Sequence, residues 1–430
     1  MRKISKLFPV INEIKKNNYN QALELLSKII AEPEDKHLEN KLYASIFFKK
    51  ENWVKSIEYY HKILEVDKKD LVALNNLAVA LFKLEKFNQS IAFLKKLLKI
   101  EKNPSNTYKS LGLAYKNIGK YDDAISNYLK LLDIEEDNNS VKQSLINIFN
   151  HHIPKETKNN FILKLNNKIL KLNEKLNYRE FVDIEIIKEF IKKNFDIIDE
   201  LDLLYNETQI FRRNKTDLNC DRHFNIFNEF NIIPKYCFNC FKVQIELENI
   251  KDLIKLFFIF NSIKLRDNNI RKCVVETRNN IRGNYKGFIF CKGLLDAKEV
   301  MKITSYKFEK FNLKPKNIII KHGCTEFYDK FPEFKKINFD GEQNFKYSKE
   351  WEKIENFYDK RLLKNNDNNE KVVGPTHNKI NLSDILIIKN WFAYAKLIGD
   401  SSYLEFYKND ININFLSNSI KNQINFRKQN

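Results

Sequence analysis

The sequence predicts an all-α repeat array followed by an α+β domain. Three observations predict this two-part fold. A 34-residue period runs through the first third of the 430-residue chain. The spacing of hydrophobic residues changes from helical to alternating near residue 218, and all six cysteines follow that change. Because one hydrophobic core seldom serves so long a chain, two or three domains are expected.

The period is set by a small residue that recurs every 34 positions, at Ala22, Ser56, Ser90 and Ala124. An aromatic residue stands three positions before each, at Tyr19, Trp53, Phe87 and Tyr121. A bulky residue stands four positions after each, at Leu26, Tyr60, Leu94 and Tyr128. Small residues let two antiparallel helices approach, and large ones fill the space beside them. One such pair cannot bury its apolar stripe alone, so four pairs are expected to stack into a solenoid.

This spacing resembles the tetratricopeptide repeat. The fourth copy matches the motif at the most positions, namely Leu111, Gly112, Tyr115, Gly119, Tyr121, Ala124 and Tyr128. The resemblance implies that the first helix of each pair lines a concave surface, the groove, which binds a protein or peptide. Motif position places these residues there: Lys41, Lys49, Asn75, Lys83, Lys109 and Lys116. Their charge favours an acidic peptide or a carboxyl terminus, and the alternative is that these lysines are simply solvated.

The region after residue 216 predicts strands as well as helices. Residues 241–247 alternate between apolar and polar side chains, as in a strand with one wet face. The expected elements are a strand at 241–247, a helix at 249–262, strands at 273–278 and 285–291, a helix at 294–312 and a strand at 317–322. This β-α-β-β-α-β order matches the ferredoxin-like split arrangement.

That topology brings the cysteines to one edge of the sheet. Cys237 and Cys240 precede the first strand, Cys273 opens the second, Cys291 closes the third and Cys324 follows the fourth. In the ferredoxin-like strand order, four-one-three-two, the first, third and fourth strands are adjacent, about 4.8 Å apart. Four sulfurs from these strands are therefore expected to meet at one centre, with Cys273 one strand further out.

A second grouping of ligands competes with the first. The run Cys220-x2-His223-x13-Cys237-x2-Cys240 has the spacing of a tetrahedral zinc site. The other set, Cys237, Cys240, Cys291 and Cys324, suits zinc or an iron–sulfur cluster. Structural buried thiols and redox or nucleophilic cysteine chemistry are the alternatives. Disulfides are disfavoured because nothing in the sequence indicates export.

The remaining segments complete a four-part division of the chain. The expected parts are a solenoid at 1–150, a helical extension or linker at 151–216, the cysteine-rich domain at 217–345, and a final segment at 346–430. Within the second part, residues 160–176 and 180–212 are expected to be helical. The final part is expected to hold a polar linker with Asn365–Asn369, an apolar packing helix from Asp384 to Ile398 capped by Ser383, and a loose tail from Asn409.

The formal net charge of +19 is large, but its distribution along the chain does not favour a nucleic-acid partner. Lysines are scattered along the chain among acidic residues, whereas a phosphate-binding surface gathers its positive charge on one face. Heavy use of Lys, Asn, Ile and Phe, with only nine glycines, is typical of an AT-rich coding background. The sequence therefore argues against a nucleic-acid partner. No apolar run approaches the ~18 residues of a membrane span, and no signal peptide is found, so a cytoplasmic location is expected.

These features favour a protein-binding adaptor or scaffold that carries a metal-stabilised, zinc or iron–sulfur, cysteine-rich module. No glycine-rich phosphate loop or nucleophile elbow is present, so the sequence leans against an enzyme. Two alternatives stay open. One is an enzyme whose repeat array presents a polypeptide to the C-terminal domain, and the other is an iron–sulfur redox protein.

Overall fold

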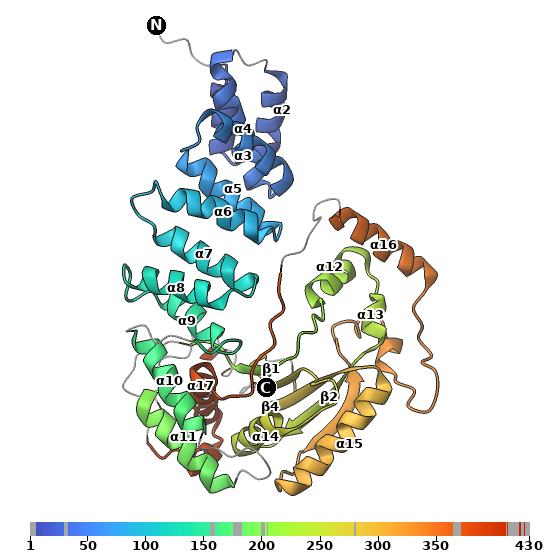
Figure 1. Cartoon of the computed structure of the whole chain (residues 1–430). Helices are drawn as coiled ribbons and strands as arrows, with labels where there is room; N and C mark the ends of the chain where they lie inside the picture. Colours follow the sequence, from blue (N-terminus) through green and yellow to red (C-terminus); the bar gives the residue numbers. More distant parts are fainter. Residues whose placement is uncertain are drawn as a thin grey trace. The chain divides into compact units, whose positions relative to one another are not determined.

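The computed structural model describes residues 6–29, 33–154, 160–174, 183–198, 203, 205–278, 281–363, 371–409, 411, 421–422 and 425. The chain forms two compact units. The first comprises Met1–Val141 and Asp359–Val373, and the second comprises Lys142–Tyr358 and Gly374–Asn430 (Figure 1). The helices between residues 161 and 198 belong to the second unit, whereas the sequence set them apart as a helical extension or linker.

The first unit contains the four antiparallel helical pairs that the period predicts. Their bounds are α1 Phe8–Lys15 with α2 Tyr19–Lys28, α3 Lys36–Lys49 with α4 Trp53–Val66, α5 Leu71–Lys83 with α6 Phe87–Leu98, and α7 Ser105–Asn117 with α8 Tyr121–Leu132. A short 3₁₀ turn, Pro33–Asp35, precedes α3. The second helix of every pair begins at the aromatic residue of the repeat, and consecutive helices stack along the chain (Figure 1).

A second feature repeats with the same period, and sequence reasoning did not find it. The residue in the turn of each pair has a left-handed backbone, at Asn17, Glu51, Glu85 and Gly119. Their φ angles lie between 55° and 72°. Only the last of the four is a glycine, which adopts this conformation without steric cost. The turn geometry is thus kept even where the residue type does not favour it.

The small residues of the period lie at the centre of each pair. Ala22 and Ser56 are fully buried, and the Ser90 hydroxyl donates to the carbonyl of Ala78 at 2.8 Å. A Cβ atom added at Gly112 would lie 2.3 Å from the Tyr128 ring. The fourth pair therefore requires glycine because its partner side chain is a tyrosine.

A short segment from late in the chain also belongs to the first unit. The Val372 N–H donates to the carbonyl of Asn117 at 2.8 Å, and its side chain lies against Gly119. Lys371 lies 3.6 Å from the Glu85 carboxylate. Residues 371–373 thus run along the turns of the third and fourth pairs.

The second unit is built on a five-stranded antiparallel sheet. Its strands are β1 Gln209–Arg212, β2 Cys240–Leu247, β3 Arg271–Val275, β4 Tyr285–Lys292 and β5 Asn317–His322, and their order across the sheet is β1-β3-β4-β2-β5. Helix α14, Ile250–Ser262, joins β2 to β3, and α15, Leu294–Lys310, joins β4 to β5. The predicted β-α-β-β-α-β order is therefore present, and β2 to β5 are its four strands.

The first strand of the sheet was not predicted. Residues 180–212 were expected to be helical, but α11, Ile184–Ile198, ends early and residues 209–212 pair with β3. The error has a physical reason: β1 is four residues long, and so short a segment shows no clear period. Residues 175–182 of this region lie outside the described residues.

Helices α14 and α15 cover one face of the sheet (Figure 1). Gly287 of β4 faces α14, where an added Cβ would lie 2.3 Å from Leu256. Side chains alternate along a strand, so Phe288 and Phe290 face the other side, together with their cross-strand neighbours Lys272 and Lys242. We call this second side the outer face.

The second unit contains further helices, two of which it shares with the first unit. They are α9 Asn139–Ile148, α10 Phe161–Glu174, α12 Cys220–Phe230, α13 Lys235–Phe238, α16 Lys349–Leu363 and α17 Leu382–Ile398, with 3₁₀ turns Pro332–Lys335 and Ser401–Glu405. Helices α9 and α16 cross the boundary between the two units. Helix α16 was not among the elements expected from the sequence in the final segment.

The apolar helix near the C-terminus packs within the second unit, as predicted. Trp391 lies edge-on to Phe257 of α14, and the Tyr394 hydroxyl donates to the carbonyl of Glu276 at 2.9 Å. Its N-cap is Asn381 rather than Ser383, because Asn381 and Asp384 form a capping box. The expected polar linker at 365–369 and most of the expected loose tail lie outside the described residues.

Candidate functional site

Four of the six cysteines lie at one edge of the sheet. The Cys324 thiol, after β5, interacts electrostatically with the thiols of Cys220, at the start of α12, and Cys237, in α13. Cys240 opens β2, and an added Cβ at Gly323 would lie 2.4 Å from its sulfur. We call Cys220, Cys237, Cys240 and Cys324 the thiol cluster.

The other two cysteines belong to the opposite face of the sheet. Cys291 pairs across the strands with Phe241, and Cys273 pairs with Gly287, which faces α14. The Cys291 thiol contacts the carbonyl of Ile289 at 3.6 Å. Cys291 therefore lies near the expected edge but on the other face, because side chains alternate along a strand. Cys273 lies in the middle of β3 and not at its start, as was expected.

The expected ligand His223 packs against an aromatic ring, and so does His322 at the end of β5. His223 is 4% exposed and stacks on Tyr236 with ring centroids 5.3 Å apart. His322 lies between the rings of Phe241, at 4.6 Å, and Phe334, at 3.9 Å. Burial lowers the pKa of His322 to about 4, so this imidazole is neutral near pH 7.

Three sulfurs of the cluster, those of Cys220, Cys240 and Cys324, have raised pKa values and are neutral thiols near pH 7. Burial, with Cys220 nearby, raises the pKa of Cys240 to about 11. Interaction with the Cys324 thiol and then burial raise the pKa of Cys220. Thiols in this state are poor nucleophiles, and a cation would be needed to stabilise their thiolates. All six cysteines are free, and among the described residues no group of three or more His, Cys, Asp or Glu side chains is arranged to hold a metal ion.

The residues assigned to the groove lie on the first helices of pairs two to four. Lys41, Lys49, Lys83 and Lys109 are exposed, whereas Asn75 and Lys116 are half-buried. Lys41 forms an ion pair with Asp70 at 2.8 Å, and the Lys83 ammonium lies 6.0 Å from the centre of the Trp53 ring. These two lysines are therefore held in place by neighbours on the same unit.

Two exposed apolar residues accompany these lysines. Val72 is 66% exposed and stands three residues before Asn75. Leu113 is 40% exposed and stands four residues after Lys109. Residues three and four apart share one side of a helix, so the first helices present apolar and basic groups together.

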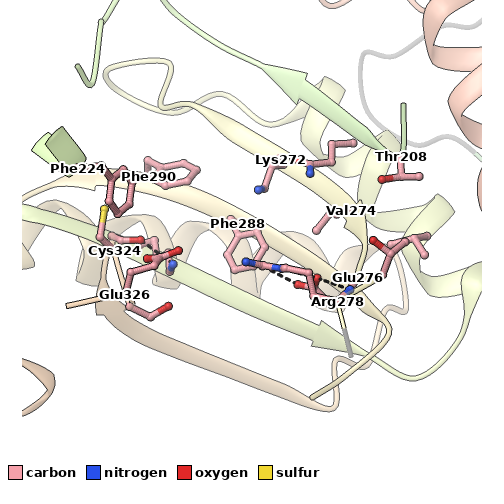
Figure 2. A pocket seen from close by; sticks show the side chains of 16 residues that line it. Thr208, Phe224, Lys272, Val274, Glu276, Arg278, Phe288, Phe290, Cys324 and Glu326 are labelled. Carbon is pink, nitrogen blue, oxygen red and sulfur yellow. Dashed lines mark hydrogen bonds and ion pairs between the residues drawn. The ribbon is translucent and has the colours of Figure 1, made fainter. Parts of the chain in front are cut away.

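Sequence reasoning missed a cavity on the outer face of the sheet. Its volume is about 390 Å³, and it lies between β2, β3, β4 and the segment after β5 (Figure 2). The residues that line it include Phe224, Lys242, Lys272, Arg278, Phe288, Phe290 and Glu326. The alternation of β2 indicated that Lys242 is on a wet face, but the pairing register that gathers the other residues cannot be read from one strand.

Cations and aromatic rings are interleaved in this cavity. The Phe288 ring lies between the ammonium groups of Lys242, at 5.3 Å, and Lys272, at 5.2 Å. Arg278 makes a two-point ion pair with Glu276, at 2.8 and 2.9 Å. Burial, together with Lys242 and Arg278, lowers the pKa of Lys272 to about 8. Gathered positive charge of this kind lowers the free energy of a bound anion.

The stacked antiparallel pairs define the first unit as an α-helical solenoid of the protein-binding repeat class. Tetratricopeptide-repeat family models match residues 71–104 and 107–142. These repeats are therefore tetratricopeptide repeats, and they indicate an adaptor or scaffold that binds protein. No described helix is long and apolar enough to cross a membrane.

Solved structures with similar folds include tetratricopeptide-repeat proteins. One is MamA, with 21% identity, a TM-score of 0.30, and coverage of 32% of this chain and 81% of that chain. Another is pilF of Pseudomonas aeruginosa, with 15% identity, a TM-score of 0.31, and coverage of 45% and 83%. A third is the C-terminal part of a TPR repeat-containing protein from Cytophaga hutchinsonii, with 19% identity, a TM-score of 0.25, and coverage of 37% and 58%. These likenesses concern the fold alone, and no curated protein matches the chain.

Proposed function

We propose that this chain is an adaptor in which the groove of the solenoid captures a protein or peptide and a zinc ion stabilises the second unit. The fourfold 34-residue period, whose third and fourth copies the tetratricopeptide-repeat models match, is the observation that carries the first half. Four thiols at one sheet edge support the second half. We further assign β2 to β5 with α14 and α15 to the ferredoxin-like arrangement, a proposal that the strand order β5-β2-β4-β3 supports.

The groove is tested by reversing its charge. Replacing Lys83, Lys109 and Lys116 with glutamate should reduce captured partner about tenfold, because like charges would face an acidic ligand. Partners are recovered on immobilised full-length protein and quantified by mass spectrometry. The matched control reverses Lys55, Lys99 and Lys130, which are exposed and lie outside the first helices. Equal loss in both variants, or no loss in the first, would contradict the assignment of the groove.

The donor set of the thiol cluster suits zinc. Sulfur ligands select zinc or an iron–sulfur cluster, and a zinc–sulfur bond of about 2.3 Å places tetrahedral sulfurs roughly 3.8 Å apart. The electrostatic interactions of the Cys324 thiol with Cys220, Cys237 and Cys240 support a shared site for the four sulfurs. Side-chain rotations would have to bring Cys240 into the same shell. The proposed ligands are therefore Cys220, Cys237, Cys240 and Cys324, a set that differs from both groupings expected from the sequence.

Metal analysis of anaerobically purified protein tests this assignment. We expect colourless protein with about one zinc per chain, and a lower melting temperature after chelation. Cys324→Ser should lose the zinc, whereas Cys291→Ala, on the other face of the sheet, should keep it. A brown protein with iron and labile sulfide would instead support the redox alternative. Absence of metal, with all six thiols open to alkylation, would show the metal proposal to be wrong.

A further inference from the structure

The outer face of the sheet gathers charge that is scattered in the sequence. Lys321 of β5, Lys242 of β2 and Phe290 of β4 are direct cross-strand neighbours. Phe288 of β4 and Lys272 of β3 are the next such pair. The register therefore places three lysines and two phenylalanines in one patch, although the five residues span 80 positions, from 242 to 321, in the chain.

Positive charge exceeds negative charge on this face. The cations of the face and its rim are Lys242, Lys272, Lys286, Lys321 and Arg278, and the carboxylates are Glu246, Glu276 and Glu326. Glu276 is already bound at two points by Arg278 and lies 4.0 Å from Lys286. Three of the cations, Lys242, Lys272 and Arg278, line the 390 Å³ cavity. An occupant of this cavity is therefore expected to be anionic.

The aromatic rings add a requirement for a flat ligand. Phe290 from β4 and Phe224 from α12 lie next to each other at one end of the cavity (Figure 2). Phe290 is half-buried, so part of its ring remains accessible, whereas the Phe288 ring is flanked by two ammonium groups. A planar group can stack on Phe290 while an attached anion meets Lys242 and Lys272.

The order of residue types along β4 has a parallel in nucleic-acid recognition. Residues 286–290 read Lys-Gly-Phe-Ile-Phe, and four-stranded sheets that bind RNA carry Lys/Arg-Gly-Phe/Tyr-Gly/Ala-Phe on a central strand. The match is partial, because Ile289 replaces the small residue and Gly293 stands where a last aromatic is usual. The two rings nevertheless stand at alternate positions of a central strand and face away from α14 and α15, as in those sheets.

We propose that the outer face binds a single-stranded nucleic acid, with a base stacked on Phe290 and its phosphates on Lys242, Lys272, Lys321 and Arg278. Base stacking and gathered cations are the two terms that bind single strands without strict sequence preference. An acidic peptide would satisfy the lysines but would leave the rings without a planar partner. This activity goes beyond partner capture by the solenoid.

Fluorescence anisotropy on the full-length chain tests the proposal. The probes are fluorescein-labelled oligouridylate and oligothymidylate of about 12 nucleotides, within the usual site size of single-strand binders. Phe290→Leu removes the stacking ring, and Lys272→Gln removes one charge. We expect each to weaken binding about tenfold, and Lys272→Gln to reduce the slope of log Kd against log salt by about one. Near-ultraviolet circular dichroism verifies that each variant is folded.

Matched controls separate this site from general attraction to a basic chain. Lys302→Gln and Tyr306→Leu remove the same kinds of group from α15, on the other face of the sheet, and should bind as the unchanged protein does. Competitors are a duplex of the same length, uridine monophosphate and an oligoglutamate peptide. Three results would each overturn the proposal. They are equal effects in the site and control variants, binding of the mononucleotide or the peptide in place of the strand, and no binding of either labelled strand.

Discussion

Asp384→Ala should lower the free energy of unfolding of the second unit by about 3–5 kcal/mol, as expected when one partner of a buried ion pair is removed. Arg212 of β1 donates to both carboxylate oxygens of Asp384, at 3.1 and 2.8 Å. The side chains are 2% and 0% exposed. Without Asp384, the guanidinium would remain buried next to Phe257 and Asn261 with no compensating charge.

The pair also joins distant parts of the chain, because Asp384 belongs to the capping box of α17 and Arg212 to the edge strand. Chemical denaturation followed by tryptophan fluorescence measures the loss. Asp384→Leu with Arg212→Met should recover most of it, since apolar residues of similar volume often replace a buried pair at little cost. About 1 kcal/mol of the free energy of unfolding should still be lost, because the double variant lacks the Asp384 side chain of the capping box.

An exposed ion pair provides the comparison. Lys346 and Glu342 lie 2.6 Å apart, but both side chains are well exposed. Lys346→Ala should therefore cost less than about 1 kcal/mol. A cost for Asp384→Ala as small as that of Lys346→Ala would mean that the buried pair does not hold β1 and α17 together.

Periodic features of the sequence were predicted well, and features that depend on pairing were not. The solenoid repeats one local rule four times, so Ala22, Ser56, Ser90 and Ala124 identify it without knowledge of distant contacts. Residues 209–212 form a strand only because β3 lies beside them, and nothing local distinguishes them from the preceding helices. The burial of Arg212 likewise depends on Asp384, 172 residues away.

The cysteines show what topology does and does not determine. Strand order predicted five of them at one edge, but Cys273 lies in the middle of β3, and the face of each strand position was not considered. Cys291 is separated from Cys240 by the alternation of side chains, while Cys220 joins the cluster through α12, an element outside the four predicted strands. The candidate ligand set therefore required the register as well as the order of the strands.

Gly112→Ala should destabilise the fourth helical pair by about 1–3 kcal/mol, in spite of the higher helix propensity of alanine. The new methyl group would lie 2.3 to 2.8 Å from three atoms of the Tyr128 ring. This ring is 1% exposed, so it has no free space into which to move. Thermal unfolding followed by circular dichroism measures the change. Because each pair stabilises only its neighbours, Lys109 and Lys116 should lose their positions and partner capture should fall in parallel.

The third pair supplies the compensating change, because Ala78 and Leu94 occupy the equivalent positions there and both are buried. Gly112→Ala combined with Tyr128→Leu should therefore restore most of the lost stability and of the partner capture. Two results together would contradict this explanation: Gly112→Ala alone leaves stability unchanged, and the double variant is no more stable than Gly112→Ala. Contact with the Tyr128 ring would then not determine which residue stands at position 112. Restoration would show that the groove depends on packing between the two helices of a pair as well as on its lysines.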